Sequence, residues 1–227
     1  MKKSTLILLT AAAPLLSGCV SNKIGGVNPT APPTKLVDSG WKLSWSPDGR
    51  QLVYGTGLGG GLEMLDLRTR QKTSLVANAK DPAWSPDSRR IAYLAHLGHR
   101  KRVYVDGKAE DVEMEFLVSG MVFSDDSKRL AYGGRRFNES FIEKFFLVVD
   151  GKKGADYDAL GYFGFSHDGK HIAFTAKKGN KMVIVVDGQE RAEYREVPAG
   201  PVFRSDGVLE FLAADKPSLY RIEVRDL

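Results

Sequence analysis

The chain has 227 residues, with 33 lysines and arginines against 28 aspartates and glutamates, so its net charge is +5. We expect this length to form one large domain and no second one. Cys19 is the single cysteine, which excludes a disulfide within the chain.

The N-terminus has the layout of a secretory signal peptide. A short positive start, residues 1–3, precedes a mostly apolar run, residues 4–16, that is too short to span a membrane. The next residues, Leu16-Ser17-Gly18-Cys19, resemble the bacterial lipobox. This resemblance implies that residues 1–18 are cleaved and that Cys19 becomes a lipidated N-terminus carrying diacylglycerol and palmitate. The alternative is that Cys19 is a small buried free thiol.

The resemblance to lipoproteins also implies that the protein is located in the bacterial cell envelope. Neither Val20 nor Ser21 is aspartate, which by the sorting pattern of known lipoproteins favours the outer membrane, facing the periplasm. Cleavage would remove Lys2 and Lys3 and leave a net charge of +3. Residues 19–33 contain a Gly-Gly pair and three prolines without hydrophobic periodicity, so we interpret them as a lipidated tether. Residues 34–227 form the predicted domain.

Five copies of one short sequence motif indicate the architecture of this domain. Their leading aromatic residues are 39, 39, 42 and 38 residues apart. A period near forty is typical of propeller blades, in which each repeat is one small sheet. The copies are Trp45-Ser46-Pro47-Asp48-Gly49, Trp84-Ser85-Pro86-Asp87-Ser88, Phe123-Ser124-Asp125-Asp126-Ser127, Phe165-Ser166-His167-Asp168-Gly169 and Phe203-Arg204-Ser205-Asp206-Gly207.

Each copy predicts two hairpins. Apolar and aromatic residues alternate after the Asp-Gly or Asp-Ser turn, as Leu52 and Tyr54 do, which predicts strand, tight turn and strand. A Val-Asp-Gly turn beginning at Val105, Val149 or Val186 closes a second hairpin. We therefore predict an all-β fold, a five-bladed β-propeller of four-stranded antiparallel blades.

The two ends of the domain predict how the propeller closes. Residues 34–37 lie eleven residues ahead of Trp45, as residues 73–76 lie ahead of Trp84. The last copy ends with three predicted strands and lacks a fourth. We therefore expect the N-terminal strand, residues 34–37, to complete the fifth blade and close the ring, which removes two sheet edges. The alternatives are an open array of five repeats and a ring completed by another chain.

Trp-Ser-Pro-Asp-Gly followed by an apolar-small-aromatic strand resembles the WD-type repeats of the TolB-like periplasmic propellers. The resemblance covers residues 34–227 and implies a propeller with a general role in periplasmic binding. TolB-type proteins carry an α/β domain before a six-bladed propeller and are soluble. Here a tether precedes five repeats and Cys19 predicts an anchor. The resemblance therefore does not imply membership of the Tol system.

No motif indicates catalysis or a cofactor. The sequence has no Gly-x-Ser-x-Gly elbow, no phosphate loop and no thiolate metal site. His96 with His99, and His167 with His171, have spacings that bind metal on a helix, but they lie on predicted turns and strands. A role in stabilising the hairpin turns explains the repeated aspartates. The alternating acids of residues 110–116 are explained by the solvent-exposed face of an outermost strand. We expect neither an enzyme nor a metal site.

The loops after the second strands predict a basic rim. They hold ten lysines and arginines against three acids, an excess of +7. Repeat three has the longest of these loops and places an aromatic residue beside two arginines. The alternative is that these lysines and arginines only lie on solvent-exposed loops and bind no partner. The candidate partner-binding residues are Arg100, Arg135, Arg136, Phe137, Lys177 and Lys178.

These features favour a lipid-anchored scaffold for protein–protein interaction in the cell envelope. A basic rim suits an envelope protein with an acidic surface. We expect a monomer that contacts the membrane through its lipid anchor only and binds no nucleic acid. A small-ligand or glycan-binding propeller is the alternative, followed by a hydrolase with an unfamiliar site.

Overall fold

The computed structural model describes residues 35–37, 41–56, 60–97 and 100–225. The chain divides into two units, Met1–Asp38 and Ser39–Leu227. Cys19, the predicted signal peptide and the tether fall outside the described residues. The described part of the second unit consists of β-strands joined by turns and contains no helix. None of the described segments is a helix long and apolar enough to cross a membrane.

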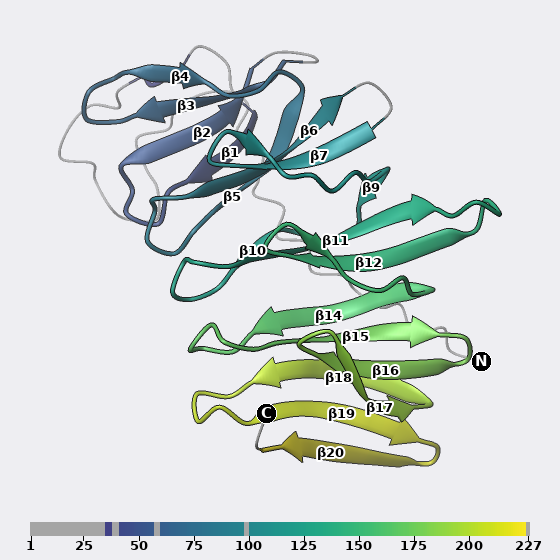
Figure 1. Cartoon of the computed structure of the whole chain (residues 1–227). Coiled ribbons are helices and arrows are strands. Elements are labelled where there is room, and N and C mark those ends of the chain that lie inside the picture. Colours follow the sequence, from purple (N-terminus) through teal and green to yellow (C-terminus); the bar gives the residue numbers. More distant parts are fainter. Residues whose placement is uncertain (1–34, 38–40, 57–59, 98–99, 226–227) are drawn as a thin grey trace, which may run out of the picture. The chain divides into compact units, whose positions relative to one another are not determined.

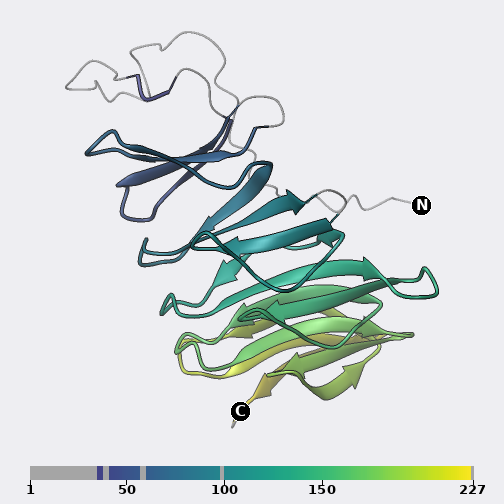
Figure 2. The same cartoon turned by 45° about the horizontal axis from the view of Figure 1, so that its top comes forward.

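The strands of the described residues pair antiparallel into five sheets, which we call blades one to five. They follow one another in chain order (Figures 1 and 2). Blade one contains β1 (Trp41–Trp45), β2 (Gln51–Gly55), β3 (Leu62–Asp66) and β4 (Lys72–Ser74). Blade two contains β5 (Ala79–Trp84), β6 (Ile91–Leu97), β7 (Arg100–Val105) and β8 (Lys108–Ala109).

Blades three to five repeat this meander with two differences. In blade three a short additional strand pairs with the second strand, and blade five has three strands among the described residues. Blade three contains β9 (Phe116–Leu117), β10 (Val122–Phe123), β11 (Leu130–Phe137), β12 (Glu143–Val149) and β13 (Lys152–Lys153). Blade four contains β14 (Ala159–Phe165), β15 (Ile172–Lys178), β16 (Lys181–Val186) and β17 (Gln189–Tyr194). Blade five contains β18 (Glu196–Phe203), β19 (Leu209–Asp215) and β20 (Ser218–Val224).

A serine and an aspartate fix the first turn of blades one to four. The hydroxyl of Ser46 donates to Asp48 Oδ1 at 2.7 Å, and the same oxygen accepts the backbone N–H of Arg50 at 3.0 Å. These bonds satisfy the tight turn locally. The serine hydrogen bond is the main reason that the pKa of the aspartate is lowered, in Asp48 as in the equivalent residues Asp87, Asp126 and Asp168. The interpretation of these aspartates as turn residues is confirmed.

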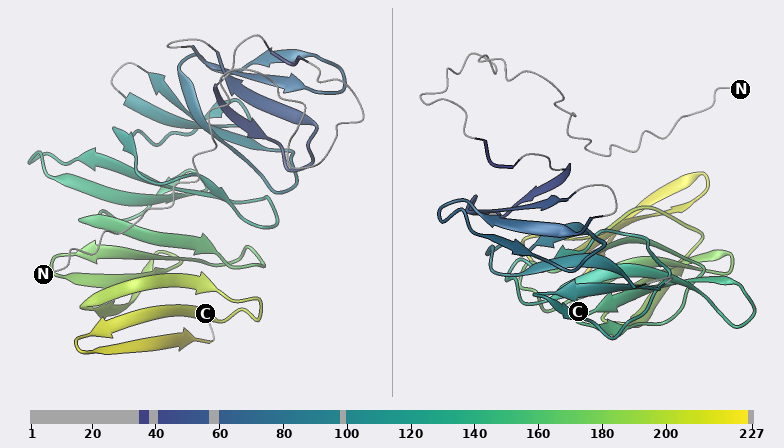
Figure 3. Two further views of the ribbon diagram at one scale, coloured as in Figure 1. Left: turned by 180° about the vertical axis from the view of Figure 1, so that it is seen from behind. Right: turned by 90° about the horizontal axis from the view of Figure 1, so that it is seen from above.

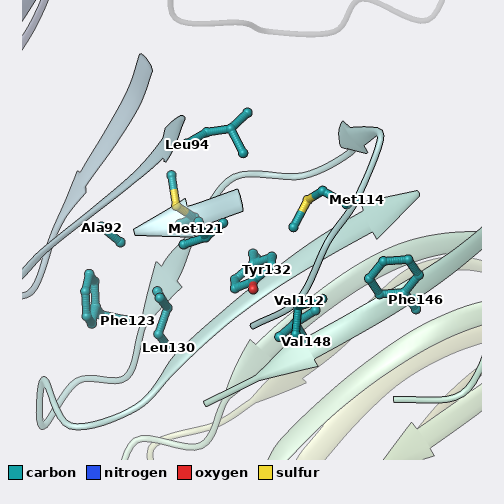
Figure 4. Close-up of a cluster of buried hydrophobic side chains, with 11 residues drawn as sticks. Ala92, Leu94, Val112, Met114, Met121, Phe123, Leu130, Tyr132, Phe146 and Val148 are labelled. Atoms are coloured by element: carbon teal, nitrogen blue, oxygen red, sulfur yellow. The ribbon is translucent and has the colours of Figure 1, made fainter. Parts of the chain in front are cut away.

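Consecutive blades share their apolar cores. Between blades two and three, Leu94 and Val103 from one sheet meet Tyr132 and Phe146 from the other, all at most 1% exposed (Figure 4). Equivalent clusters join blades one and two, three and four, and four and five. Because an isolated blade would expose these faces to water, each blade depends on its neighbours.

One arginine clamps blade three to blade four at the end of the sheets where the first turns lie. Arg129 Nε pairs with Asp150 Oδ2 of its own blade at 2.9 Å. Its Nη1 donates to the carbonyl oxygens of Gly169 at 3.0 Å and Lys170 at 2.8 Å, in the next blade. The guanidinium carbon lies 5.0 Å from the centre of the Phe165 ring, the leading aromatic residue of blade four. We call this residue an inter-blade arginine.

Arg90 makes the same contacts between blades two and three. It pairs with Asp106 at 3.1 Å and donates to the carbonyl oxygens of Ser127 at 3.2 Å and Lys128 at 2.7 Å. Its guanidinium lies 5.3 Å from the ring centre of Phe123. Both arginines stand six residues after the leading aromatic residue of their own repeat, a position that Gln51 takes in repeat one and His171 in repeat four. The arginine clamp thus joins blade two to three and blade three to four.

The predicted closure of the ring is wrong for this structure, because the sheets are not closed. Residues 35–37 carry no strand, and β20 is the outer strand of blade five. Blades one and five lie at opposite ends of the series (Figures 1 and 3). The prediction of a closing strand rests on the likeness of residues 34–37 to residues 73–76, of which only the first two belong to β4, a strand of three exposed residues. So short and exposed a segment specifies pairing only weakly.

Replacing Arg129 with alanine should destabilise the domain. The change leaves the carbonyl groups of Gly169 and Lys170 without this donor and Asp150 without its cation, so we expect a loss of about 1–3 kcal/mol in unfolding free energy. Lys128→Ala is the matched control, because its side chain is 80% exposed and its ion pair with Asp126 is weak. Urea denaturation of the mature protein measures both variants. Equal midpoints would show that the clamp does not hold the blades together.

Candidate functional site

The segment of residues 110–117 crosses from blade two to blade three and pairs with both. Lys101 N–H donates to the Met114 carbonyl at 3.0 Å, and Met114 N–H returns a bond of 3.2 Å. Two residues later, β9 joins β11, with Phe116 opposite Arg135. This crossing segment therefore ties together the ends of the two blades at which the loops after the second strands lie (Figure 1).

The prediction that residues 110–116 form an outermost strand is confirmed only in part. Glu110 and Met114 hydrogen-bond to β7, the third strand of blade two, but the segment forms an isolated bridge there and no continuous strand. The outer strand of blade two is β8, which covers only two residues. The predicted alternation is present, because Val112 and Met114 are 7% and 2% exposed and their neighbours carry the charges. Both buried side chains join the core between blades two and three (Figure 4). The same alternation of apolar and charged residues is expected for two structures. One is a segment that covers a core, and the other is an edge strand with one solvent-exposed face.

Phe116 lies between two cations at the end of this segment. Lys101 Nζ is 3.9 Å from the centre of its ring, and the guanidinium carbon of Arg135 is 4.2 Å from it. Such cation–π contacts fix the ring while leaving 44% of Phe116 exposed. Burial, followed by the positive charges of Lys80 and Arg135, lowers the pKa of Lys101. Lys80 and Arg135 thus lie close enough to Lys101 to disfavour its charge.

A cleft of about 550 Å³ opens beside Phe116. Its wall combines three cations, two carboxylates and exposed aromatic surface, so it can offer charge-assisted hydrogen bonds together with apolar contact. Met114 supplies a buried part of the lining. The lining residues are Arg100, Lys101, Glu113, Met114, Glu115, Phe116, Arg136 and Phe137.

The structure brings together three of the six predicted site residues. Arg100, Arg136 and Phe137 line the cleft, and Arg135 holds Phe116 beside it. Lys177 and Lys178, which end β15 in blade four, are not among the lining residues. The arginines lie on strands and not on loop tips, because β11 continues to Phe137. Phe116 is not among the six predicted site residues, because its place in the alternation of residues 110–116 gives no separate signal.

The cations of the predicted basic rim are mostly paired with carboxylates. The predicted excess of +7 includes only the acids in the loops after the second strands. Carboxylates that follow the third strands or lie between blades bind many of the same cations. Glu113, for example, binds both Arg100 and Arg102. The other pairs are Arg135–Glu143, Arg136–Asp156, Lys144–Asp158, Lys178–Glu190, Lys181–Glu193 and Lys216–Glu196.

The described histidines are dispersed. In the part of the chain that the structure describes, no group of three or more His, Cys, Asp or Glu side chains could hold a metal ion. His167 and His171 each lie 2.7 Å from one aspartate, Asp125 and Asp187 respectively. Burial, followed by the charges of two nearby lysines, lowers the pKa of His96.

No protein-family model matches this chain, and no curated protein sequence matches it. Its structure is similar to that of TolB from Acinetobacter baumannii, with 15% identity and a TM-score of 0.41 over 82% of this chain and 52% of that one. A putative TolB from Agrobacterium tumefaciens matches with 19% identity and a TM-score of 0.41, over 78% and 70% of the two chains. The β-propeller domain of the Trilobed protease from Pyrococcus furiosus matches with 14% identity and a TM-score of 0.46, over 82% and 68%. The chain spans about half the length of the first of these proteins.

Arg135→Ala should destabilise the protein, although the sequence alone places this residue in a loop. The change removes a cation from the ring of Phe116 and the partner of Glu143, so we expect a loss of about 1–2 kcal/mol. Lys177→Ala is the control, because this exposed lysine occupies the equivalent position of β15 and should change stability by less than about 0.5 kcal/mol. Thermal denaturation compares the two variants. An equal response would mean that the contact with Phe116 contributes nothing to stability.

Proposed function

We propose that this protein is a lipid-anchored periplasmic β-propeller that acts as an interaction scaffold in the bacterial cell envelope. Its partner is an envelope protein with an acidic surface, which docks in the cleft between blades two and three. The observation that carries this proposal is Phe116, which Lys101 and Arg135 hold half exposed beside the cleft. Exposed apolar surface that is rimmed by polar groups marks sites of protein interaction.

The charges around the cleft favour an anionic partner. The pKa of Lys101 is lowered in part by Lys80 and Arg135, so a carboxylate that enters would relieve the repulsion among these cations. Arg100 presents a guanidinium that is 69% exposed. Charge-assisted hydrogen bonds to a planar carboxylate suit arginine better than lysine.

The apolar surface beside the cleft favours a protein as the partner. The hairpin between β11 and β12 exposes 41% of Phe137, 86% of Phe141 and 54% of Ile142. Aromatic residues next to arginine are the pair enriched at the energetic centres of protein interfaces. A small anion would cover little of this hairpin.

A small-ligand or glycan binder is the second candidate. The cleft volume, about 550 Å³, lies within the range of small-molecule sites. In that case the cleft would bind a soluble anionic or glycan ligand, and the hairpin would contact nothing.

Photo-crosslinking in living cells distinguishes the two candidates. A photoreactive amino acid at Phe141, the hairpin tip of blade three, should give a discrete protein adduct. The matched site is Asn180, the equivalent exposed tip of blade four, which should give none. The double variant Arg100→Ala, Arg136→Ala should reduce the adduct from Phe141 by about tenfold or more, since it removes both exposed guanidinium groups. Absence of the adduct, or equal adducts at both tips, contradicts docking at this cleft.

The anchor is tested separately through Cys19. Cys19→Ala should leave the protein unprocessed and without lipid, because the thiol is the only attachment point that the lipobox pattern provides. Ser21→Ala is the control and should be processed normally. Mass spectrometry of the N-terminus and membrane fractionation measure both variants. A diacylglycerol-modified N-terminus recovered from the Cys19 variant would refute the lipoprotein assignment.

A further inference from the structure

The joint between blades four and five lacks the inter-blade arginine. Six residues after the leading aromatic residue, where repeats two and three have Arg90 and Arg129, repeat four has His171. Its Nδ1 lies 2.7 Å from Asp187 Oδ2, and Asp187 corresponds to Asp150, the partner of Arg129. The imidazole therefore keeps the contact within its own blade. Among the described residues, the shorter imidazole makes no contact like the two that Arg129 makes with carbonyl groups of the next blade.

A cavity of about 520 Å³ occupies this joint. Gly207, on its far side, stands four residues after the leading aromatic Phe203, as Gly169 stands after Phe165. The Gly169 carbonyl is one of the two that accept a hydrogen bond from Arg129. The cavity thus lies between the residue that replaces the arginine and the turn that corresponds to its acceptor. It is lined by Ser166, His167, Asp168, His171, Ser205 and Gly207.

We propose that this cavity binds the guanidinium group of an arginine side chain presented by a partner. The protein itself shows the recognition chemistry twice, at Arg90 and Arg129. In both joints a guanidinium meets an aspartate, two turn carbonyls and an aromatic ring. Of this set, the cavity offers one carboxylate, Asp168, and the turn of Gly207, which corresponds to Gly169. A planar group with five donors can bond to such acceptors together, whereas an ammonium group cannot make the same fork of hydrogen bonds.

Asp168 is the one carboxylate among the residues that line the cavity. A hydrogen bond from Ser166, and then backbone and side-chain bonds from Lys170, lower the pKa of Asp168, so this lining residue is a carboxylate at neutral pH. Lys170 offsets part of that charge from 3.2 Å. An incoming guanidinium would add a second counter-ion and the hydrogen bonds that the histidine does not supply.

This site is separate from the cleft between blades two and three. The cavity lies at the first turns, beside the beginning of β15, whereas the cleft lies at the end of β11 beside the loops that follow the second strands. Substitutions in one site therefore leave the other intact. The proposal does not depend on the function assigned to the cleft.

The test is a titration followed by NMR through the backbone amides of Ser205 and Gly207. The probe is the peptide acetyl-Gly-Arg-Gly-amide, and its lysine counterpart is the matched control. We expect saturable shifts with the arginine peptide and binding at least about fivefold weaker with the lysine peptide. Equal binding of the two peptides, or no saturation with either, overturns the proposal.

Two variants locate the binding in the cavity. His171→Arg supplies the missing guanidinium from within the chain, so it should abolish binding of the peptide and raise the melting temperature. Ser205→Trp fills the cavity from an exposed turn and should abolish binding even if His171→Arg does not fold. Lys177→Arg adds an arginine at the other end of the same strand and should leave binding unchanged. Full binding by either folded blocking variant places the peptide elsewhere and refutes the site.

Discussion

The structure depends on apolar faces that no blade can bury alone. Each core lies between two consecutive sheets, and its largest side chains, such as Tyr132 and Phe146, are almost fully withdrawn from water. Polar groups at these joints must then find partners close by. The hydroxyl of Tyr132 donates to Glu110 at 2.6 Å, and burial raises the pKa of that carboxyl. The joints between blades therefore contribute to stability together with the sheets themselves.

The same constraint places the candidate site. Between blades two and three the chain does not pass straight into the next sheet. It first covers the joint with the crossing segment, which contributes Val112 and Met114 to the shared core. Phe116 follows them at the edge of that core, where the half-buried side chains of Lys101 and Arg135 reach its ring. The cleft is thus a consequence of how this one joint is covered.

The sequence predicts the blades well because the turn residues act locally. The hydroxyl of Ser46 bonds to Asp48 and Gln51, within five residues, and the serine–aspartate bond recurs in repeats two to four. The partners of the cations are harder to predict. Arg136 pairs with Asp156, twenty residues away, and its pairing depends on the path of the chain between blades. For the same reason, a count of charges by loop gave a more basic rim than the structure has.

The inter-blade arginines can be predicted from the sequence only in part. Arg90 and Arg129 can be aligned from the repeats, but their acceptors belong to the next repeat and include backbone carbonyls, which leave no trace in the sequence. A likeness of four residues was likewise too little to place a closing strand. Hydrogen bonds within one turn can therefore be predicted from this sequence. Contacts between repeats can be predicted only when the arrangement of the sheets is known.

The exposed outer strand of blade five has a consequence for solubility. β20 has hydrogen-bonding partners only on its β19 side among the described residues, and Leu219 and Tyr220 are 61% and 50% exposed. Such an edge is a template for pairing with other chains. Charged residues interrupt its apolar run, since Arg221 pairs with Glu210 at 2.6 Å and Glu223 with Arg225 at 2.8 Å. Bringing a second strand against this edge would disturb these ion pairs, so charge along β20 opposes self-association of the protein.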